Sequence, residues 1–301
     1  MSRSIAERVR GTDDSVRVLA RVLGGRRRSA VVVGDAESIL QLVPDGTFRC
    51  CVTSPPYWGL RDYGIPHQIG AEPKLSDYLD NLVRIFREAR RVLTDDGTLW
   101  LNIGDSYTSG NRRWRAADRK NPARAMTYRP QTPEGLKPKD LIGVPWRLAL
   151  ALQADGWYLR ADVIWHKPNC QPESVRDRPT RAHEYVFLLS KSKDYYYDRQ
   201  GMREPANGNG RFRNRRTVWS INTESFPEVH FATFPPSLAE PCIIAGTAKG
   251  DIVLDPFFGS GTVGVVCEAI GRRFLGIELN PEYAQIARNR LAESKTLWHE
   301  T

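Results

Sequence analysis

Two prolines and two aromatic residues follow a short apolar run at residues 50–53. The segment reads Thr53-Ser54-Pro55-Pro56-Tyr57-Trp58. Consecutive prolines fix φ and remove two backbone donors, so the nearby carbonyl oxygens are predicted to point outward without local partners. Such oxygens could accept hydrogen bonds from the amino group of a ligand, and Tyr57 and Trp58 offer flat faces for a planar ring. Ordinary packing of a loop is the competing interpretation.

A glycine-rich segment lies about two hundred residues further along the chain. Residues 259–264 read Gly-Ser-Gly-Thr-Val-Gly, and Glu278 ends the next predicted strand. In this G-x-G-x-x-G pattern the glycines let the backbone approach a ligand, and the acidic residue accepts hydrogen bonds from ribose hydroxyls. The pattern alone is compatible with a nicotinamide dinucleotide and with S-adenosylmethionine.

Two features favour S-adenosylmethionine. Asp255 directly precedes the glycine loop, where a carboxylate would repel a pyrophosphate and attract an ammonium group. Only about 50 residues follow Asp251, too few for a complete dinucleotide-binding domain, so upstream strands must complete the sheet. Asp35 follows another predicted strand, where α/β sheets bind ligands, although it could equally cap the next helix.

The hydrophobic pattern predicts alternating strands and helices. Ser76 is predicted to cap one helix, and Asp95-Asp96-Gly97 to form the turn that ends that unit. Because strand, helix and strand alternate, we expect an α/β fold of Rossmann-like type with a mostly parallel sheet. The strands are expected at 30–33, 50–53, 98–103, 158–165, 184–189, 251–255 and 274–278, and the helices at 36–42, 76–93, 145–154, 237–245, 262–270 and from 281 onward.

The chain is strongly basic, with a net charge of +9 and a pI near 9.4, which points toward a polyanionic partner or an anionic surface. Residues 1–29 form a basic arm with a weak helical pattern, for which a solvated leading helix is favoured over a DNA-contacting arm. Two further basic segments interrupt the pattern at 105–139 and 198–225, and the remaining ranges, 30–104 and 140–301, form the predicted catalytic domain. The basic segments are predicted to contact nucleic acid through Arg112, Arg113 and Arg115 and through Arg211, Arg213 and Arg215.

Other function classes find little support in the composition. No apolar stretch reaches the length of a membrane span, so we expect a soluble, cytoplasmic protein. The five cysteines show neither C-x-x-C nor Cys/His ligand spacing, so we expect reduced thiols and no metal site. Cys242 follows Pro241 in the manner of a thiolate nucleophile for C5 of cytosine, but it falls on a predicted core helix and is expected to be structural.

Together the two motifs resemble a known family. Residues 54–57 ahead of Asp255-Pro256-Phe257-Phe258-Gly259-Ser260-Gly261-Thr262 look like the β class of amino-group DNA methyltransferases, whose fold is circularly permuted so that the catalytic motif precedes the cofactor motif. The resemblance covers roughly residues 30–293. In that family Ser at the first motif position is common in enzymes for cytosine N4, whereas Asp or Asn is common in enzymes for adenine N6.

The resemblance implies a reaction and a set of roles. A cytosine would be flipped out of double-stranded DNA and methylated on N4 by S-adenosylmethionine. A restriction endonuclease would be the functional partner, and the enzyme would be a monomer or a homodimer of bacterial, archaeal or phage type. Adenine N6, an RNA or protein substrate, a nicotinamide oxidoreductase and a non-catalytic nucleic-acid-binding module remain alternatives. The implied catalytic residues are Ser54, Pro55, Pro56 and Tyr57, and the implied cofactor residues are Asp35, Asp255, Phe257, Gly259, Ser260, Gly261, Thr262 and Glu278.

Overall fold

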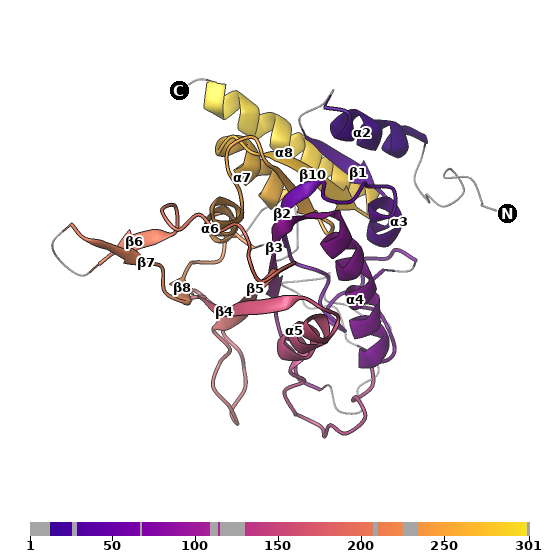
Figure 1. The fold of residues 1–301 in the computed structure, drawn as a ribbon. Coiled ribbons are helices and arrows are strands. Elements are labelled where there is room, and N and C mark those ends of the chain that lie inside the picture. The colour runs from indigo at the N-terminus through magenta and orange to yellow at the C-terminus, as the bar shows by residue number, and fades with distance from the viewer. Residues whose placement is uncertain are drawn as a thin grey trace.

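A single large sheet organises the chain in the computed structural model (Figure 1). The structure describes residues 13–25, 29–66, 68–108, 114, 130–206, 210–224 and 234–299. Eight strands follow the order β1-β10-β9-β2-β3-β5-β4-β8. Their bounds are β1 Ala30–Val33, β2 Phe48–Thr53, β3 Leu93–Ile103, β4 Tyr158–His166, β5 His183–Ser190, β8 Val218–Ser220, β9 Ile252–Asp255 and β10 Arg273–Glu278.

Most neighbouring strands run parallel, as the sequence pattern predicts. The pairs from β1 across to β3 are parallel, as is the pair of β4 with β8, whereas β5 runs antiparallel to both β3 and β4. The expected α/β fold with a mostly parallel sheet is therefore confirmed.

Helices cover both faces of the sheet, and each face has its own hydrophobic core. Successive strand residues point to opposite faces, so Cys51 is buried in one core and Cys50 in the other. No helix in the described ranges is both long and apolar enough to cross a membrane. One face carries α2 Asp13–Leu23, α3 Ala36–Leu40, α4 Leu75–Val92 and α5 Val144–Ala154, and the other carries α6 Pro236–Gly246, α7 Thr262–Ala269 and α8 Pro281–His299.

Two local predictions about the unit around α4 are wrong. α4 begins at Leu75, so Lys74 holds the N-cap position without a side-chain cap and Ser76 lies inside the helix, where its hydroxyl donates to the Asp77 carboxylate. Residues 95–97 form no separate turn. They belong to an irregular part of β3, where the register against β2 shifts and Arg49 of β2 pairs with Asp96.

The basic segments at 1–29 and 198–225 contain more structure than their composition suggests. Leu19 and Val22 of α2 are buried in the core, so the expectation of a merely solvated helix is wrong. In the second segment, β6 Arg203–Pro205 and β7 Phe212–Asn214 form a hairpin, and β8 joins the main sheet. Strands of three residues are too short to show a periodic pattern, which is why the sequence does not reveal them.

Gly276 of β10 supplies space for the glycine-rich loop that follows β9. A Cβ atom at Gly276 would lie 2.2 Å from Cδ2 of Phe258, a buried ring that stacks on Phe274. We expect Gly276→Ala to displace this ring and to lower the free energy of unfolding by about 1–3 kcal/mol, measured by urea denaturation. The loss should shrink in a Phe258→Leu background, and an equal loss in both backgrounds would show that the clash is not the cause.

Candidate active site and cofactor cleft

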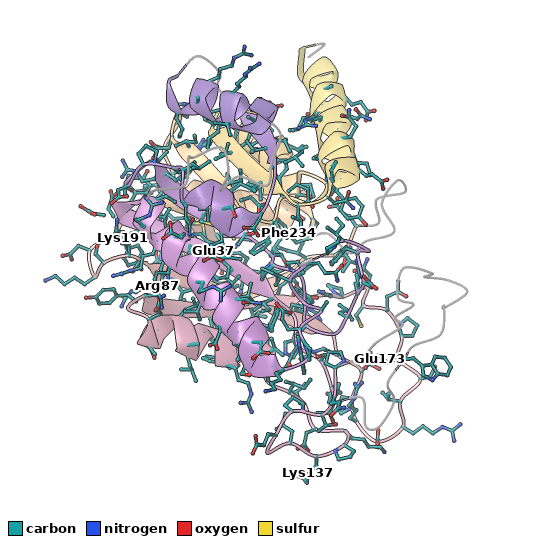
Figure 2. The ribbon with its side chains drawn as sticks, turned by 90° about the vertical axis from the view of Figure 1, so that its right-hand side faces the viewer. Glu37, Arg87, Lys137, Glu173, Lys191 and Phe234 are labelled. Carbon is teal, nitrogen blue, oxygen red and sulfur yellow. The ribbon has the colours of Figure 1, made fainter. Side chains whose placement is uncertain are left out.

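The two sequence motifs meet in one cavity of about 880 Å³. The cavity lies where β1, β2, β9 and β10 end, and parallel strands bring these ends to a common edge of the sheet. Figure 2 labels two other lining residues, Glu173 and Phe234, which come from loops far apart in the sequence. The predicted site residues on its wall are Asp35, Ser54, Pro55, Pro56, Tyr57, Asp255, Phe257, Gly259, Ser260, Thr262 and Glu278.

The turn after β2 is held by hydrogen bonds that the sequence does not predict. The Tyr78 hydroxyl donates to the Pro56 carbonyl oxygen over 2.9 Å, so the prediction that the carbonyls lack local partners is wrong at Pro56. Trp58 is 4% exposed, and its indole N–H donates to the Glu72 carbonyl oxygen. The prediction that Trp58 offers a free ring face is therefore wrong, because the ring packs into the core beside α4. Tyr57 is the aromatic residue of the motif that lines the cavity.

Tyr57 belongs to a polar network that the sequence analysis missed. Its hydroxyl donates to Oε2 of Glu184 over 2.8 Å, and the Ser54 hydroxyl lies 3.3 Å from it. Lys167 forms an ion pair with the other oxygen of Glu184. Burial, followed by the charge of Glu184, raises the pKa of Tyr57 well above its ordinary value. In the sequence, Glu184 and Lys167 are covered only by the general resemblance of residues 30–293 to the methyltransferase family.

Asp255 is a buried carboxylate at the end of β9. Thr53 donates to its Oδ1 over 2.6 Å and the Phe257 backbone N–H donates to the same oxygen over 3.1 Å. Within the described ranges no donor reaches Oδ2 and no Lys or Arg forms an ion pair with Asp255. Burial outweighs the two hydrogen bonds and raises the pKa of Asp255 to about 7.

Glu278 fixes the glycine loop against β10. Its Oε2 accepts from the Gly259 N–H over 2.7 Å, and its Oε1 accepts from the Asn280 N–H over 2.8 Å. Burial raises its pKa. Gly259 has a φ of 51°, a left-handed conformation that favours glycine, and its missing Cβ leaves the backbone open to close approach.

The remaining cofactor residues serve the loop in different ways. The side chains of Ser260 and Thr262 are buried and accept hydrogen bonds from Arg290 of α8, so their backbone is better placed than their hydroxyls to meet a ligand. Gly261 precedes α7 with a φ of 83° and is not part of the cavity wall. Asp35 caps α3 through the Ser38 N–H and hydroxyl, as the competing interpretation held, and it also lines the cavity.

Comparisons with known proteins agree with the two motifs. Residues 48–289 match the sequence profile of the N6/N4 methyltransferase family, described as DNA methylase. Type II methyltransferase M.Cfr9I of Citrobacter freundii is 66% identical over 263 residues, which are 87% of this chain and 87% of that protein. M.SmaI of Serratia marcescens is 64% identical over 266 residues, which are 88% of this chain and 91% of that protein. The chain belongs to the N6/N4 DNA methylase family.

Solved structures support the same fold for this DNA methylase. A putative DNA modification methylase of Thermus thermophilus, complexed with S-adenosylmethionine, aligns with a TM-score of 0.63 and 26% identity over 88% of this chain and 94% of its own. The cytosine-N4-specific PvuII DNA methyltransferase aligns with a TM-score of 0.66 over 89% of this chain and 91% of its own. The PvuII likeness, at 19% identity, shows the fold alone. S-adenosylmethionine, the cofactor predicted from the sequence, is the methyl donor of the family.

The cleft of this DNA methylase fits S-adenosylmethionine. The cofactor carries an ammonium group, a carboxylate, a ribose and an adenine ring, and it supplies an electrophilic methyl group when bound. Asp255 lines the cavity and has one carboxylate oxygen that no donor from the described residues reaches, and Gly259 presents an open backbone. A carboxylate suits the ammonium group of the cofactor, and an open backbone allows the cofactor to approach closely.

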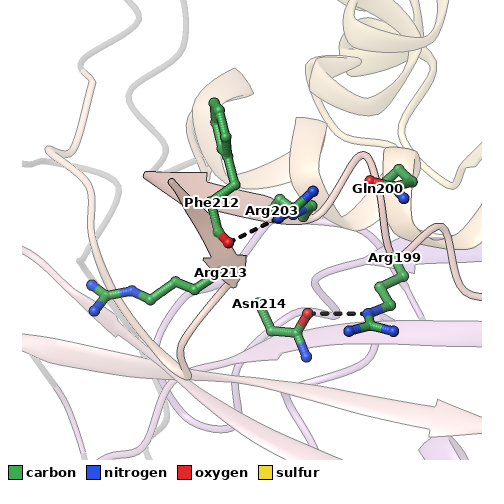
Figure 3. A pocket seen from close by; sticks show the side chains of 6 residues that line it. All are labelled: Arg199, Gln200, Arg203, Phe212, Arg213 and Asn214. Atoms are coloured by element: carbon green, nitrogen blue, oxygen red, sulfur yellow. Dashed lines mark hydrogen bonds between the residues drawn. The ribbon is translucent and has the colours of Figure 1, made fainter. Parts of the chain in front are cut away.

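Of the predicted DNA contacts, those that the structure describes do not line this cleft. Arg112, Arg113 and Arg115 lie outside the described residues. Arg213 lines a smaller cavity of about 550 Å³ at the β6–β7 hairpin, together with Arg199 and Arg203 (Figure 3). Arg211 is exposed, Arg215 lies over the Trp219 ring, and Arg213 forms an ion pair with Glu204.

Four of the five cysteines of the DNA methylase are buried in the core. Cys50, Cys51, Cys242 and Cys267 are buried free thiols, and Cys170 is half-buried. Burial raises the pKa of Cys50 to about 12 and that of Cys242 well above its ordinary value. Cys242 is therefore poorly suited to act as a thiolate nucleophile. Among the described residues no cluster of His, Cys, Asp and Glu could hold a metal ion.

The raised pKa of Asp255 makes stability depend on pH. Since its folded pKa of about 7 exceeds the ordinary value of 3.8, the folded protein retains a proton that the unfolded chain releases. The contribution is present below about pH 4 and is lost as the pH rises through 7. Between pH 5 and pH 8 we expect the native protein to lose roughly 1–3 kcal/mol more free energy of unfolding than Asp255→Asn, measured by urea denaturation. Equal losses in the two proteins would contradict the assigned cause.

Proposed function

We propose that this DNA methylase transfers a methyl group from S-adenosylmethionine to the exocyclic N4 of cytosine in a specific sequence of double-stranded DNA. The observation that carries the choice of base is Ser54, which stands at the first position of the catalytic motif and lines the cavity. Adenine N6 is the second candidate because the family includes both activities.

The turn after β2 is proposed to orient the target amine. An amine in a stacked and paired base is inaccessible, so the cytosine must leave the duplex to enter the cavity. The Ser54 hydroxyl and the Pro55 carbonyl oxygen then accept hydrogen bonds from the NH2 group, and Tyr57 stacks on the ring. No donor from the described residues reaches the Pro55 oxygen, which leaves it available. Orientation of this kind removes much of the barrier without a covalent intermediate.

The cofactor roles follow from the charges and openings of the cleft. Asp255 is proposed to pair with the methionine ammonium and Glu278 to accept from the ribose hydroxyls. Phe257 and the backbone at Gly259 would lie along the edge of the cofactor, with Asp35 beside a polar group. Cofactor binding would stabilise the buried Asp255 carboxylate most, because a bound cation would favour its charged form.

The biological setting is proposed from the relatives. Since they are named type II methyltransferases, a restriction endonuclease of the same specificity is the proposed functional partner in the bacterial cytoplasm. The protecting methyl group would then be added at the site that the endonuclease cleaves.

The identity of the product tests the proposed function. After incubation with double-stranded DNA and S-adenosylmethionine, nucleoside digestion and mass spectrometry should show N4-methylcytosine. Ser54→Ala should lower turnover by about 10-fold or more, because one acceptor for the amine is lost, while calorimetry should show unchanged affinity for the cofactor. N6-methyladenine as the product would overturn the choice of base.

The β6–β7 hairpin is proposed as a DNA contact because of its arginines. Replacing Arg211, Arg213 and Arg215 by Ala should weaken DNA binding and reduce the slope of log K against log salt by up to about 0.9 per lost phosphate contact. The control replaces Arg84, Arg87 and Lys193, basic residues of α4 and of the loop after β5, and it removes the same charge. Equal slopes for the native protein and the hairpin variant would show that the hairpin does not contact DNA.

A further inference from the structure

A chain of hydrogen bonds leads from the catalytic motif to a carboxylate. The Ser54 Oγ lies 3.3 Å from the Tyr57 Oη and donates to it. The Tyr57 hydroxyl donates in turn to Oε2 of Glu184 over 2.8 Å. Ser54, which is proposed to bind the amine, begins the chain of bonds and Glu184 ends it, and all three residues line the cavity. The donors therefore point in one direction, from the amine position toward the carboxylate.

A competing acceptor for the Tyr57 proton is weaker. Oδ1 of Asn102 lies 3.3 Å from the Tyr57 hydroxyl, whereas Oε2 of Glu184 lies 2.8 Å away and belongs to a charged group. The Asn102 amide N–H2 donates to the Tyr185 carbonyl oxygen and to Oε2 of Glu184. Asn102 therefore holds the carboxylate in position beside the phenol.

Glu184 carries its own counter-ion. Its side chain is 17% exposed and that of Lys167 is 16% exposed, and the two form an ion pair through Oε1. The ammonium group of Lys167 lies 4.1 Å from the centre of the Trp165 ring, which fixes it further. Because Lys167 uses Oε1, the other oxygen stays directed at Tyr57. Lys167 thus compensates the charge of a carboxylate that is largely shielded from water.

Methylation of an exocyclic amine creates a need for a proton acceptor. The nitrogen gains a carbon and a positive charge, and one of its protons must leave to give the neutral product. A methylated, positively charged base amine is a strong acid, so a carboxylate of ordinary basicity can take the proton.

We propose that Glu184 is the terminal acceptor of this proton, which it receives through Ser54 and Tyr57. The proposal rests on the proposed transfer to an exocyclic amine. As the N–CH3 bond forms and the electron pair of the C–S bond stays with sulfur, the amine proton passes to Ser54 Oγ. The Ser54 proton passes to Tyr57 Oη, and the Tyr57 proton passes to Glu184 Oε2. After the product leaves, Glu184 returns the proton to water.

The environment of Tyr57 suits an exchange of protons. Burial and the nearby Glu184 carboxylate raise the pKa of the phenol well above its ordinary value, so Tyr57 releases a proton only as it gains one. Ser54 and Tyr57 are thus positioning residues for the proton as well as for the base. A variant that lacks only the Tyr57 hydroxyl should therefore lose the proton path but keep the stacking ring.

Two conservative variants test the relay. Glu184→Gln keeps an acceptor for Tyr57 but cannot take a proton, and Tyr57→Phe keeps the stacking ring but breaks the chain. We expect each to lower the single-turnover methylation rate by about 10-fold or more and to reduce the solvent deuterium isotope effect on that rate. The double variant should be no slower than the slower single variant, because both changes interrupt the same path.

Binding measurements separate the relay from structural damage. Cofactor affinity by calorimetry and base extrusion by 2-aminopurine fluorescence should be unchanged in both variants. In the enzyme without cofactor, the Tyr57 ¹³Cζ resonance can be assigned because it is missing from the spectrum of Tyr57→Phe. This resonance should shift in Glu184→Gln. Glu88→Gln is the matched control, since Glu88 is also a partly buried glutamate in an ion pair, with Arg91, but lies on α4. It should leave the rate, the isotope effect and the resonance unchanged.

The outcomes distinguish the relay from the proposed function. If Tyr57→Phe and Glu184→Gln retain the native rate and isotope effect while native enzyme yields N4-methylcytosine, the relay is wrong and the proposed function stands. If both single variants are slow and their effects on the rate add in the double variant, Glu184 is structural and the relay is again wrong. Loss of base extrusion in the variants would lead to the same conclusion. A product other than a methylated exocyclic amine would overturn both.

Discussion

The hydrogen bond between Thr53 and Asp255 joins the two halves of the active site. The residues are 202 positions apart, yet the Thr53 hydroxyl donates to the Asp255 carboxylate over 2.6 Å in a fully buried position. It depends on the parallel pairing of β2 with β9, in which Cys51 lies opposite Leu254. With this pairing in place, the turn that begins at Ser54 and the loop that begins at Pro256 must leave the same edge of the sheet, one beside the other.

A reversal in the sheet brings the third part of the site to the same edge. β5 runs antiparallel to β3, with Tyr185 opposite Ile103 at the carboxyl end of β3. The amino end of β5 therefore lies where the parallel strands have their carboxyl ends, and Glu184 reaches Tyr57 from there. In an entirely parallel sheet, residue 184 would lie at the opposite edge. The antiparallel strand thus adds a carboxylate that the two motifs themselves do not contain.

The sequence predicts much of this arrangement, because periodicity shows the longer elements and the motifs mark the strand ends that carry ligands. The site residues that the sequence did not predict correctly, Glu184, Lys167 and Trp58, depend on contacts between distant parts of the chain. Glu184 and Lys167 meet Tyr57 only through strand order and direction, which one sequence does not reveal. The burial of Trp58 depends on its contacts with α4 and on the acceptor that Glu72 provides. Local errors, such as Ser76, arise at the ends of helices, because a sequence pattern fixes the first residue of a helix only to within one or two positions.

Two carboxylates in one cleft, the buried Asp255 and the partly buried Glu184, have contrasting electrostatic environments. Glu184 is paired with Lys167 of the same chain, so its charge is compensated before any ligand arrives. Asp255 forms no ion pair within the described residues, and burial raises its pKa to about 7, so below that pH a proton takes the place of a cation. A carboxylate with a built-in partner can serve as a fixed acceptor, whereas one without a partner gains free energy when a cationic ligand binds. We infer that this difference, more than the identity of the acidic side chain, separates the amine half of the cleft from the cofactor half.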